Sequence, residues 1–276
     1  DISVTSDTGE AVGIYAFANG GGDITVDNTG DISVSGYTVA AGVHLQTTGD
    51  VALTSAGAID ASASGDTYAY AVGVELYGYD VYFNTTGPIT ATATADPDAG
   101  VAYATGADIE GVYTAVYVHA PITADASGYY AFATGLEVNG SYGVTLGLYG
   151  DITATATGDF VGAYGLQASS YVDVLVYSFG DITATANGSG YSSAVAVSID
   201  SLAGDIFFYN GGNIVATGAD QAVAVELYGA GSTLLINDGL IAAYADAYGG
   251  IAFRSGDADD SVLNYGTIVG SFVTGD

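Results

Sequence analysis

The sequence contains no cysteine, methionine, tryptophan or lysine, and Arg254 is its only arginine. Without cysteine the chain can form neither a disulfide framework nor a thiolate metal site, and it has no thiol nucleophile. The single basic residue stands against 31 acidic ones, which gives a formal charge of −30 over 276 residues. Because such a charge repels phosphate groups, we expect no binding to nucleic acid or to an acidic membrane surface.

Long hydrophobic runs are missing as well. Gly, Asp, Ser or Thr interrupts every apolar stretch before it reaches about 18 residues, the length that indicates a membrane-spanning helix. We therefore expect no direct insertion into a membrane. Hydrophobic side chains still make up 49% of the sequence, and many are Ala, Val, Ile and Tyr, which can build a packed core. This composition is unlike that of a disordered acidic tail.

A short phrase recurs ten times along the chain. It consists of Gly or Ala, a variable residue and Ile, followed by alternating small and polar residues, as in GDITATATGD from Gly150 and GDITATANGS from Gly180. The ten isoleucines are Ile2, Ile32, Ile59, Ile89, Ile122, Ile152, Ile182, Ile214, Ile241 and Ile268. Their mean spacing of about 30 residues is typical of a solenoid.

Each period contains three segments with the pattern of a strand. The isoleucine phrase alternates with the two-residue period of a strand that has one buried face. A variable loop follows, then a second strand such as AVGVELY from Ala71, then a shorter third strand such as DVYFNTTG from Asp80. Three strands per repeat predict an all-β fold, a parallel β-helix of about ten coils that forms one domain over residues 1–276.

Asparagine recurs four residues before the repeat isoleucine, at Asn210, Asn237 and Asn264 on consecutive coils, and again at Asn28. Such a column can form hydrogen bonds along the axis of a solenoid. Asparagine also tolerates the left-handed conformation that turns require. We favour the second interpretation, in which these residues serve the turn.

The segment from Leu235 to Phe272, LINDGLIAAYADAYGGIAFRSGDADDSVLNYGTIVGSF, is similar in pattern to the repeats of autotransporter passenger domains and related adhesins of Gram-negative bacteria. The N-x-G-x-I and G-D-I-T repeats extend this resemblance over most of the chain. The resemblance implies a right-handed β-helix that is exported to the cell surface or the extracellular space. Within residues 1–276 the sequence shows no segment like the C-terminal membrane barrel of that family and no trypsin-like protease motif.

Both ends of the sequence lie in or just after an isoleucine phrase. Neither end has the atypical capping repeat with which solenoids cover their core. We expect either a segment of a longer rod or a filament subunit that stacks end to end on other copies of itself.

A catalytic function is less expected than a non-catalytic one. His44, His119 and Arg254, the side chains that could act on acidic sugars, fall on different coils. A hydrolase of neutral sugars needs only two or three carboxylates, and the best local candidates are Asp257, Asp259 and Asp260. Their setting, SGDADDS, is also typical of a solvated turn. We predict that the protein is not an enzyme.

Acidic side chains form a column in the second strand. The column is formed by the residue that follows the G-(I/L/V) step of each second strand, or its counterpart, and in chain order it consists of Tyr15, His44, Glu75, Asp108, Glu137, Gln167, Ser198, Glu226 and Ala252. If the coils are in register, Glu75, Asp108 and Glu137 stand about 4.8 Å apart, where calcium would relieve their repulsion. The alternative is a solvated acidic stripe that blocks sideways aggregation. No GGxGxD array of calcium-binding β-rolls is present, and we favour the stripe.

Two further surfaces suggest contacts. T-x-T pairs from Thr90 to Thr185 occupy four successive coils and resemble the flat ice-binding faces of some β-helical antifreeze proteins, although Asp125 interrupts them. Aromatic faces bind sugar rings or protein partners, and one coil carries the cluster Tyr68, Tyr70, Tyr77, Tyr79 and Tyr82. The loops at Asp96–Gly100 and Asp125–Tyr130 are expected to present variable contacts.

Together these patterns predict an extracellular or cell-surface, non-catalytic rod. Its role would be structural, as a stalk, fibre or matrix filament, or adhesive. The alternative is a passenger domain that binds a cell-surface glycan or protein, with a carbohydrate-active enzyme or an ice-binding protein as further alternatives.

Overall fold

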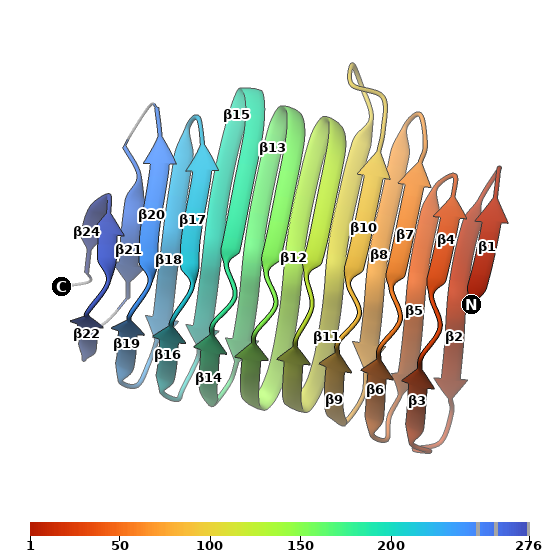
Figure 1. Ribbon diagram of the computed structural model, residues 1–276, viewed down its shortest axis with the longest axis horizontal. Helices are drawn as coiled ribbons and strands as arrows, with labels where there is room; N and C mark the ends of the chain where they lie inside the picture. Colours follow the sequence, from red (N-terminus) through yellow and green to blue (C-terminus); the bar gives the residue numbers. More distant parts are fainter. Residues whose placement is uncertain (247–248, 257–258, 275–276) are drawn as a thin grey trace.

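In the computed structural model the chain winds into a stack of coils, and strands of one coil pair in parallel with the equivalent strands of the next (Figure 1). The structure describes residues 1–246, 249–256 and 259–274. Strands are the only regular elements in these ranges. Within the same ranges there is no helix long and apolar enough to cross a membrane. The predicted all-β parallel solenoid is confirmed, with about nine full turns, close to the ten coils expected.

Three ladders of parallel strands form the walls of the solenoid. The first ladder holds the isoleucine phrases: β1 (Ile2–Ser6), β4 (Ile32–Gly36), β7 (Ile59–Ser64), β10 (Ile89–Thr94), the beginnings of β12 (Ile122–Leu148), β13 (Ile152–Ser170) and β15 (Ile182–Ser201), then β17 (Asn213–Gly218), β20 (Leu240–Ala245) and β23 (Thr267–Val269). Equivalent residues pair directly, for example Ile122 with Ile89 and Ile152. The isoleucine repeat therefore fixes the register of the whole stack.

The second and third ladders complete each coil. The second comprises β2 (Glu10–Ala18), β5 (Val39–Thr47), β8 (Tyr68–Tyr77), the beginning of β11 (Val101–Val118), the middle of β12, the ends of β13 and β15, β18 (Gln221–Gly229), β21 (Ile251–Ser255) and β24 (Ser271–Val273). The third comprises β3 (Ile24–Asn28), β6 (Val51–Ser55), β9 (Asp80–Thr85), the ends of β11 and β12, β14 (Asp173–Ser178), β16 (Ile206–Asn210), β19 (Thr233–Asn237) and β22 (Asp260–Asn264).

The core is a set of axial columns of apolar side chains. Ile, Val, Leu, Ala and Phe from all three ladders point inward and are almost fully buried, in one continuous cluster that runs from Ala11 to Phe253. A glycine column in the second ladder gives the isoleucines room: a Cβ on Gly106 would lie 2.3 Å from Cγ2 of Ile122. The glycine in AVGV-type strands is thus required by close packing between two ladders.

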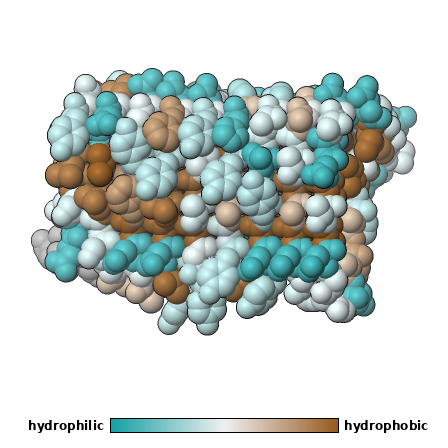
Figure 2. Space-filling view, turned by 60° about the horizontal axis from the view of Figure 1, so that its bottom comes forward, coloured by the Kyte–Doolittle hydropathy of each residue, from teal (hydrophilic) through white to brown (hydrophobic). Residues whose placement is uncertain are grey.

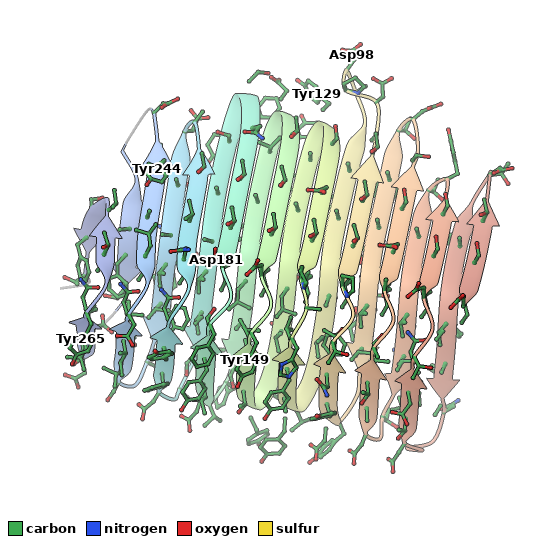
Figure 3. The ribbon with its side chains drawn as sticks, viewed as in Figure 1. Asp98, Tyr129, Tyr149, Asp181, Tyr244 and Tyr265 are labelled. Atoms are coloured by element: carbon green, nitrogen blue, oxygen red, sulfur yellow. The ribbon has the colours of Figure 1, made fainter. Side chains whose placement is uncertain are left out.

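The two predicted loops differ in the structure. Residues 95–100 form a loop between β10 and β11, and Asp98 lies at its exposed tip (Figure 3). The prediction of a loop at Asp125–Tyr130 was wrong, because these residues continue strand β12 around the corner between the first and second ladders. Residues 125–127 pair with both neighbouring coils, and Gly128 pairs with Gly158 of the following coil.

Candidate functional site

The acidic column lies on the outer face of the second ladder, in the order predicted from Tyr15 to Glu226. Strand pairing places Glu75 beside Asp108 and Asp108 beside Glu137 on consecutive coils. The assignment of Ala252 to this column was wrong: Arg254 pairs with Glu226, and Ala252 is buried. Ala252 is the counterpart of the column glycine, as Ala224 is one coil earlier, and the outward residue two positions later is Arg254.

Hydrogen-bond donors from the protein surround the first two carboxylates of this column. Nδ1 of His44 lies 2.5 Å from Oε2 of Glu75. The hydroxyl of Tyr77 donates to Oδ2 of Asp108 at 3.0 Å and lies 3.3 Å from Oε1 of Glu75. Tyr70 donates to the same Glu75 oxygen at 3.4 Å. Two tyrosines and a histidine therefore bind the carboxylates that a cation would otherwise have to neutralise.

Burial raises the pKa of Asp108 to about 6, and the charges of Glu137 and Glu75 shift it in the same direction. The hydrogen bond from Tyr77 opposes this shift because it stabilises the charged carboxylate. Burial also raises the pKa of Tyr77, together with the negative charges of Asp108 and Glu75. The repulsion between the carboxylates of this column is therefore reduced when Asp108 binds a proton.

The structure offers limited support for a calcium site. Glu75, Asp108 and Glu137 are neighbours along the axis, as predicted, but in the described ranges no three His, Cys, Asp or Glu side chains converge as metal ligands would. Asn139 donates to Oε1 of Glu137 at 3.3 Å. Calcium binding at these three residues stays a prediction.

Near the C-terminal end, the column changes from like charges to an ion pair. Nη1 of Arg254 lies 3.6 Å from Oε2 of Glu226, and Ser198 donates to the other oxygen of the same carboxylate at 2.9 Å. The only arginine of the chain is thus engaged in a pair within its own column. His119, in contrast, stacks on Tyr149 at the corner before the first ladder, with ring centroids 4.8 Å apart. The structure does not bring the two histidines and Arg254 together.

The predicted asparagine column combines both roles considered for it. Nδ2 of Asn210 donates to Oδ1 of Asn237, and Nδ2 of Asn237 donates to Oδ1 of Asn264, both at 2.7 Å. Each Nδ2 also donates to the carbonyl oxygen two residues ahead, as Asn210 does to Gly212 at 3.0 Å. Asn28 instead donates to Ser55 of the next coil at 3.0 Å. The column therefore shapes the turn and links the coils along the axis.

Aspartates at two corners of the coil link neighbouring coils, a role that was not predicted from the sequence. At the corner before the third ladder, Oδ1 of Asp23 accepts the backbone N–H of Asp50 at 3.1 Å. At the corner before the first ladder, Oδ1 of Asp151 accepts the N–H of Asp181 at 2.9 Å. Each carboxylate thus binds the equivalent residue of the next coil. The recurring Asp before Ile in the G-D-I phrase was the available signal.

The remaining sequence candidates are placed as follows. Asp257 lies outside the described residues, whereas Asp260 begins β22 and pairs with Thr233. The T-x-T pairs are in register on the outer face of the first ladder, with Asp125 between Thr92 and Thr155. Ice binding by this face stays a prediction.

The tyrosine cluster does not form one platform. Tyr70 and Tyr77 turn toward the carboxylates, whereas Tyr68 and Tyr82 are exposed and lie near aromatic rings of the next coil. The ring centroids are 6.1 Å apart for Tyr68 and Tyr103 and 6.0 Å apart for Tyr82 and Tyr117. Two of the five rings, those of Tyr68 and Tyr82, thus pair with tyrosines of the next coil.

Two hollows follow the corner between the second and third ladders. One of about 480 Å³ is lined by Gln46, Tyr77 and Ser141 among others, and one of about 310 Å³ by Asn139, Tyr171 and Asp200 among others. Both are lined by Glu110, Gly111 and Ser141. They therefore form one polar groove along the axis, with a tyrosine in each part.

Comparison with models of known protein families, with curated proteins and with solved structures gives no match. The resemblance to autotransporter passenger domains therefore rests on the repeat pattern and the solenoid fold alone.

Proposed function

We propose that the chain is an extracellular, non-catalytic rod that acts as a structural or adhesive stalk or filament on a bacterial surface. The observation that carries the proposal is the continuous in-register stacking, in which the isoleucine of each coil pairs with that of the next, as from Ile122 to Ile182. Backbone hydrogen bonds between parallel strands point along the stacking axis. Separating two coils along the axis therefore requires the hydrogen bonds of three strands to break.

The distribution of acidic groups supports a structural role. Aspartates at the corners bind backbone N–H groups of the next coil, as Asp151 binds Asp181. Asp108 and Glu75 are bound by tyrosines of their own ladder. The corner aspartates link neighbouring coils, and the remaining negative charge keeps rods from aggregating sideways through the second ladder.

A second candidate function is the binding of a neutral glycan in the polar groove. The groove offers a carboxylate at Glu110, an amide at Asn139 and a hydroxyl at Ser141, the groups that exchange hydrogen bonds with sugar hydroxyls. Tyr77 and Tyr171 supply aromatic surface for the apolar side of a sugar ring. The net charge of −30 disfavours acidic sugars.

Single-molecule stretching tests the rod. A chain held at both ends should resist force and then lengthen in steps, each of about 100 Å for one coil of about 30 residues. Smooth extension at low force would overturn a mechanical role. Electron microscopy of the purified chain then distinguishes isolated rods from end-to-end filaments.

Glycan binding is tested on an array of neutral and acidic glycans. The adhesin candidate requires binding that Asn139→Ala and Tyr171→Ala weaken and that Thr185→Ala, on the first ladder, leaves unchanged. Release of reducing sugar from any bound glycan would contradict the non-catalytic assignment.

A further inference from the structure

A hollow of about 450 Å³ lies on the outer face of the third ladder, over the coils of β6, β9, β11 and β12. Small residues at outward positions leave this space open: Ala52, Ala115, Gly143 and Thr145. Further along the same row stand larger side chains, Leu175, Phe207 and Leu234. The third ladder lies at the bottom in Figure 1 and comes forward in Figure 2, where a hydrophobic band runs along the long axis with rows of hydrophilic side chains beside it.

Two exposed tyrosines form walls of this hollow. Tyr82 and Tyr113 line it, with 42% and 52% of their surface exposed. The ring centroids of Tyr82 and Tyr117 are 6.0 Å apart, and those of Tyr113 and Tyr142 are 5.9 Å apart. Each wall therefore has an aromatic neighbour on the next coil. The faces of such rings carry a negative potential that attracts cations.

Two carboxylates stand at one end of the hollow. Asp50 and Asp80 occupy the same corner position on consecutive coils, about 4.8 Å apart, and both are exposed. Oδ1 of Asp50 accepts the backbone N–H of Asp80 at 3.2 Å. The next two positions of this corner column are Tyr113 and Gly143 rather than aspartates. The run of corner aspartates that begins at Asp23 therefore ends beside the aromatic part of the hollow.

The chain supplies no cation of its own to this hollow. It has no lysine, Arg254 pairs with Glu226 on the second ladder, and neither histidine lines the hollow. A bare metal ion would find too few ligands, because in the described ranges no three His, Cys, Asp or Glu side chains converge. An alkylammonium group suits the lining better, since its nitrogen can contact carboxylates and ring faces while its stem covers apolar surface.

We propose that this hollow binds a lysine side chain of a basic partner protein. The ammonium lies between Asp50 and Asp80, beside the tyrosine rings, and the four-carbon stem packs over Ala115. Two separate carboxylates suit the three donors of an ammonium, whereas the planar fork of a guanidinium is matched to a single carboxylate. A second copy of this chain is excluded as the occupant, because it contains no lysine.

The net charge favours the approach of such a partner, although the contact at this hollow is weak by itself. A charge of −30 attracts basic proteins from a distance. Ion pairs at an exposed surface contribute little, so we expect a dissociation constant of about 1 mM for a single lysine. Binding should weaken as salt screens the carboxylates. The site goes beyond the proposed function, because a structural rod and an adhesive rod could both carry it.

An NMR titration tests the ligand. The probes are N-acetyl-lysine methylamide and the same molecule acetylated on Nζ, which keeps the stem and removes the charge. We expect the first probe to shift the amide signals of Ala115 and Gly143 in a saturable way, and the second to bind about tenfold more weakly or less. Equal binding of the two probes, or no saturable shift at these positions, would overturn the proposal. Tighter binding of tetramethylammonium would assign the hollow to a small quaternary ammonium ligand and would overturn it as well.

Variants of the lining test the site. Asp80→Asn should weaken binding of the lysine probe about threefold, because one of the two charges is lost. Tyr82→Leu should weaken it by a similar factor, whereas Tyr82→Phe keeps the ring and should leave binding unchanged. Ala115→Leu should abolish binding, because the added side chain fills the hollow while both carboxylates remain.

Matched controls distinguish this site from a general attraction to an acidic surface. Asp60→Asn removes an exposed charge from the first ladder, and Tyr149→Leu removes an exposed ring at another corner. Both should leave binding unchanged, and circular dichroism checks that every variant folds. Equal weakening by Asp80→Asn and Asp60→Asn would refute a defined site. The stretching of single rods does not involve this hollow, so the two proposals can fail separately.

Discussion

At the residue scale, burial and the hydrogen bonds of single side chains determine the protonation of the acidic column and its effect on stability. Asp108 has a raised pKa, so the folded state binds its proton more tightly than the unfolded state does. The stabilisation that comes from this bound proton is fully present below the ordinary pKa of 3.8 and is lost as the pH rises through about 6. Neither its tyrosine partner nor this shift is visible in the sequence, because both depend on side-chain rotamers across two coils.

Asp108→Asn should therefore stabilise the protein at pH 7 and have little effect at pH 4. Asparagine keeps a carbonyl oxygen for Tyr77 and removes the charge beside Glu137, so we expect a gain of about 1–2 kcal/mol at pH 7. Urea unfolding at several pH values measures it. Asp125→Asn on the first ladder serves as the control. An equal gain at pH 4 would show that the proton of Asp108 is not the cause.

Asn237 is the buried middle member of the asparagine column, with partners in both neighbouring coils. Asn237→Ala removes two side-chain bonds along the axis and one to the carbonyl of Gly239. We expect a loss of about 2–3 kcal/mol in the free energy of unfolding, since buried polar groups lose their partners. Asn264→Ala, at the exposed end of the column, should cost less. Equal losses would mean that the turn bond alone matters.

At the element scale, what the sequence predicts depends on how strictly an element repeats. The first ladder was predictable residue by residue because isoleucine marks the same position in each coil. The coil that contains β21 was not, because the Gly250-Ile251 step resembles the glycine step of earlier coils, whereas Ala252 is the residue at the column glycine's position. The loop predicted at Asp125–Tyr130 was wrong for a different reason. Polar and glycine residues near a solenoid corner resemble a loop, yet residues 125–127 pair with the coils on both sides and the strand continues through Tyr130.

Gly106→Ala tests the packing between the first and second ladders. The added Cβ would lie 2.3 Å from Cγ2 of Ile122 and 2.4 Å from the carbonyl oxygen of Gly135, so atoms on two coils would have to move. We expect a loss of about 1–3 kcal/mol, as for overpacked cores. Gly143→Ala is the matched control, since its Cβ would meet nothing closer than 3.9 Å. Thermal unfolding compares the two variants, and similar melting temperatures would refute the packing account.

At the scale of the whole molecule, the net charge opposes the stacking that the ladders favour. A charge of −30 with one arginine leaves most carboxylates without a cationic partner, and axial stacking holds equivalent aspartates one coil apart. Salt screens exposed charges over about 10 Å at 0.1 M and about 3 Å at 1 M. The solenoid is therefore expected to be more stable at high ionic strength, in contrast to proteins held together by surface ion pairs.

Thermal unfolding in NaCl from about 0.02 M to 0.5 M should raise the melting temperature by about 5 °C or more. Comparing the melting temperatures in calcium and in magnesium at matched ionic strength distinguishes charge screening from binding at a specific site. Screening alone predicts equal effects of the two ions, because neither needs a defined ligand set. Stabilisation by calcium beyond that by magnesium, lost in Glu137→Gln, would instead establish the column of Glu75, Asp108 and Glu137 as a calcium site. In that case calcium would have to displace Tyr77 and His44 from the carboxylates that they now bind. Calcium would also compete with the proton of Asp108, so its binding would weaken as Asp108 takes up that proton.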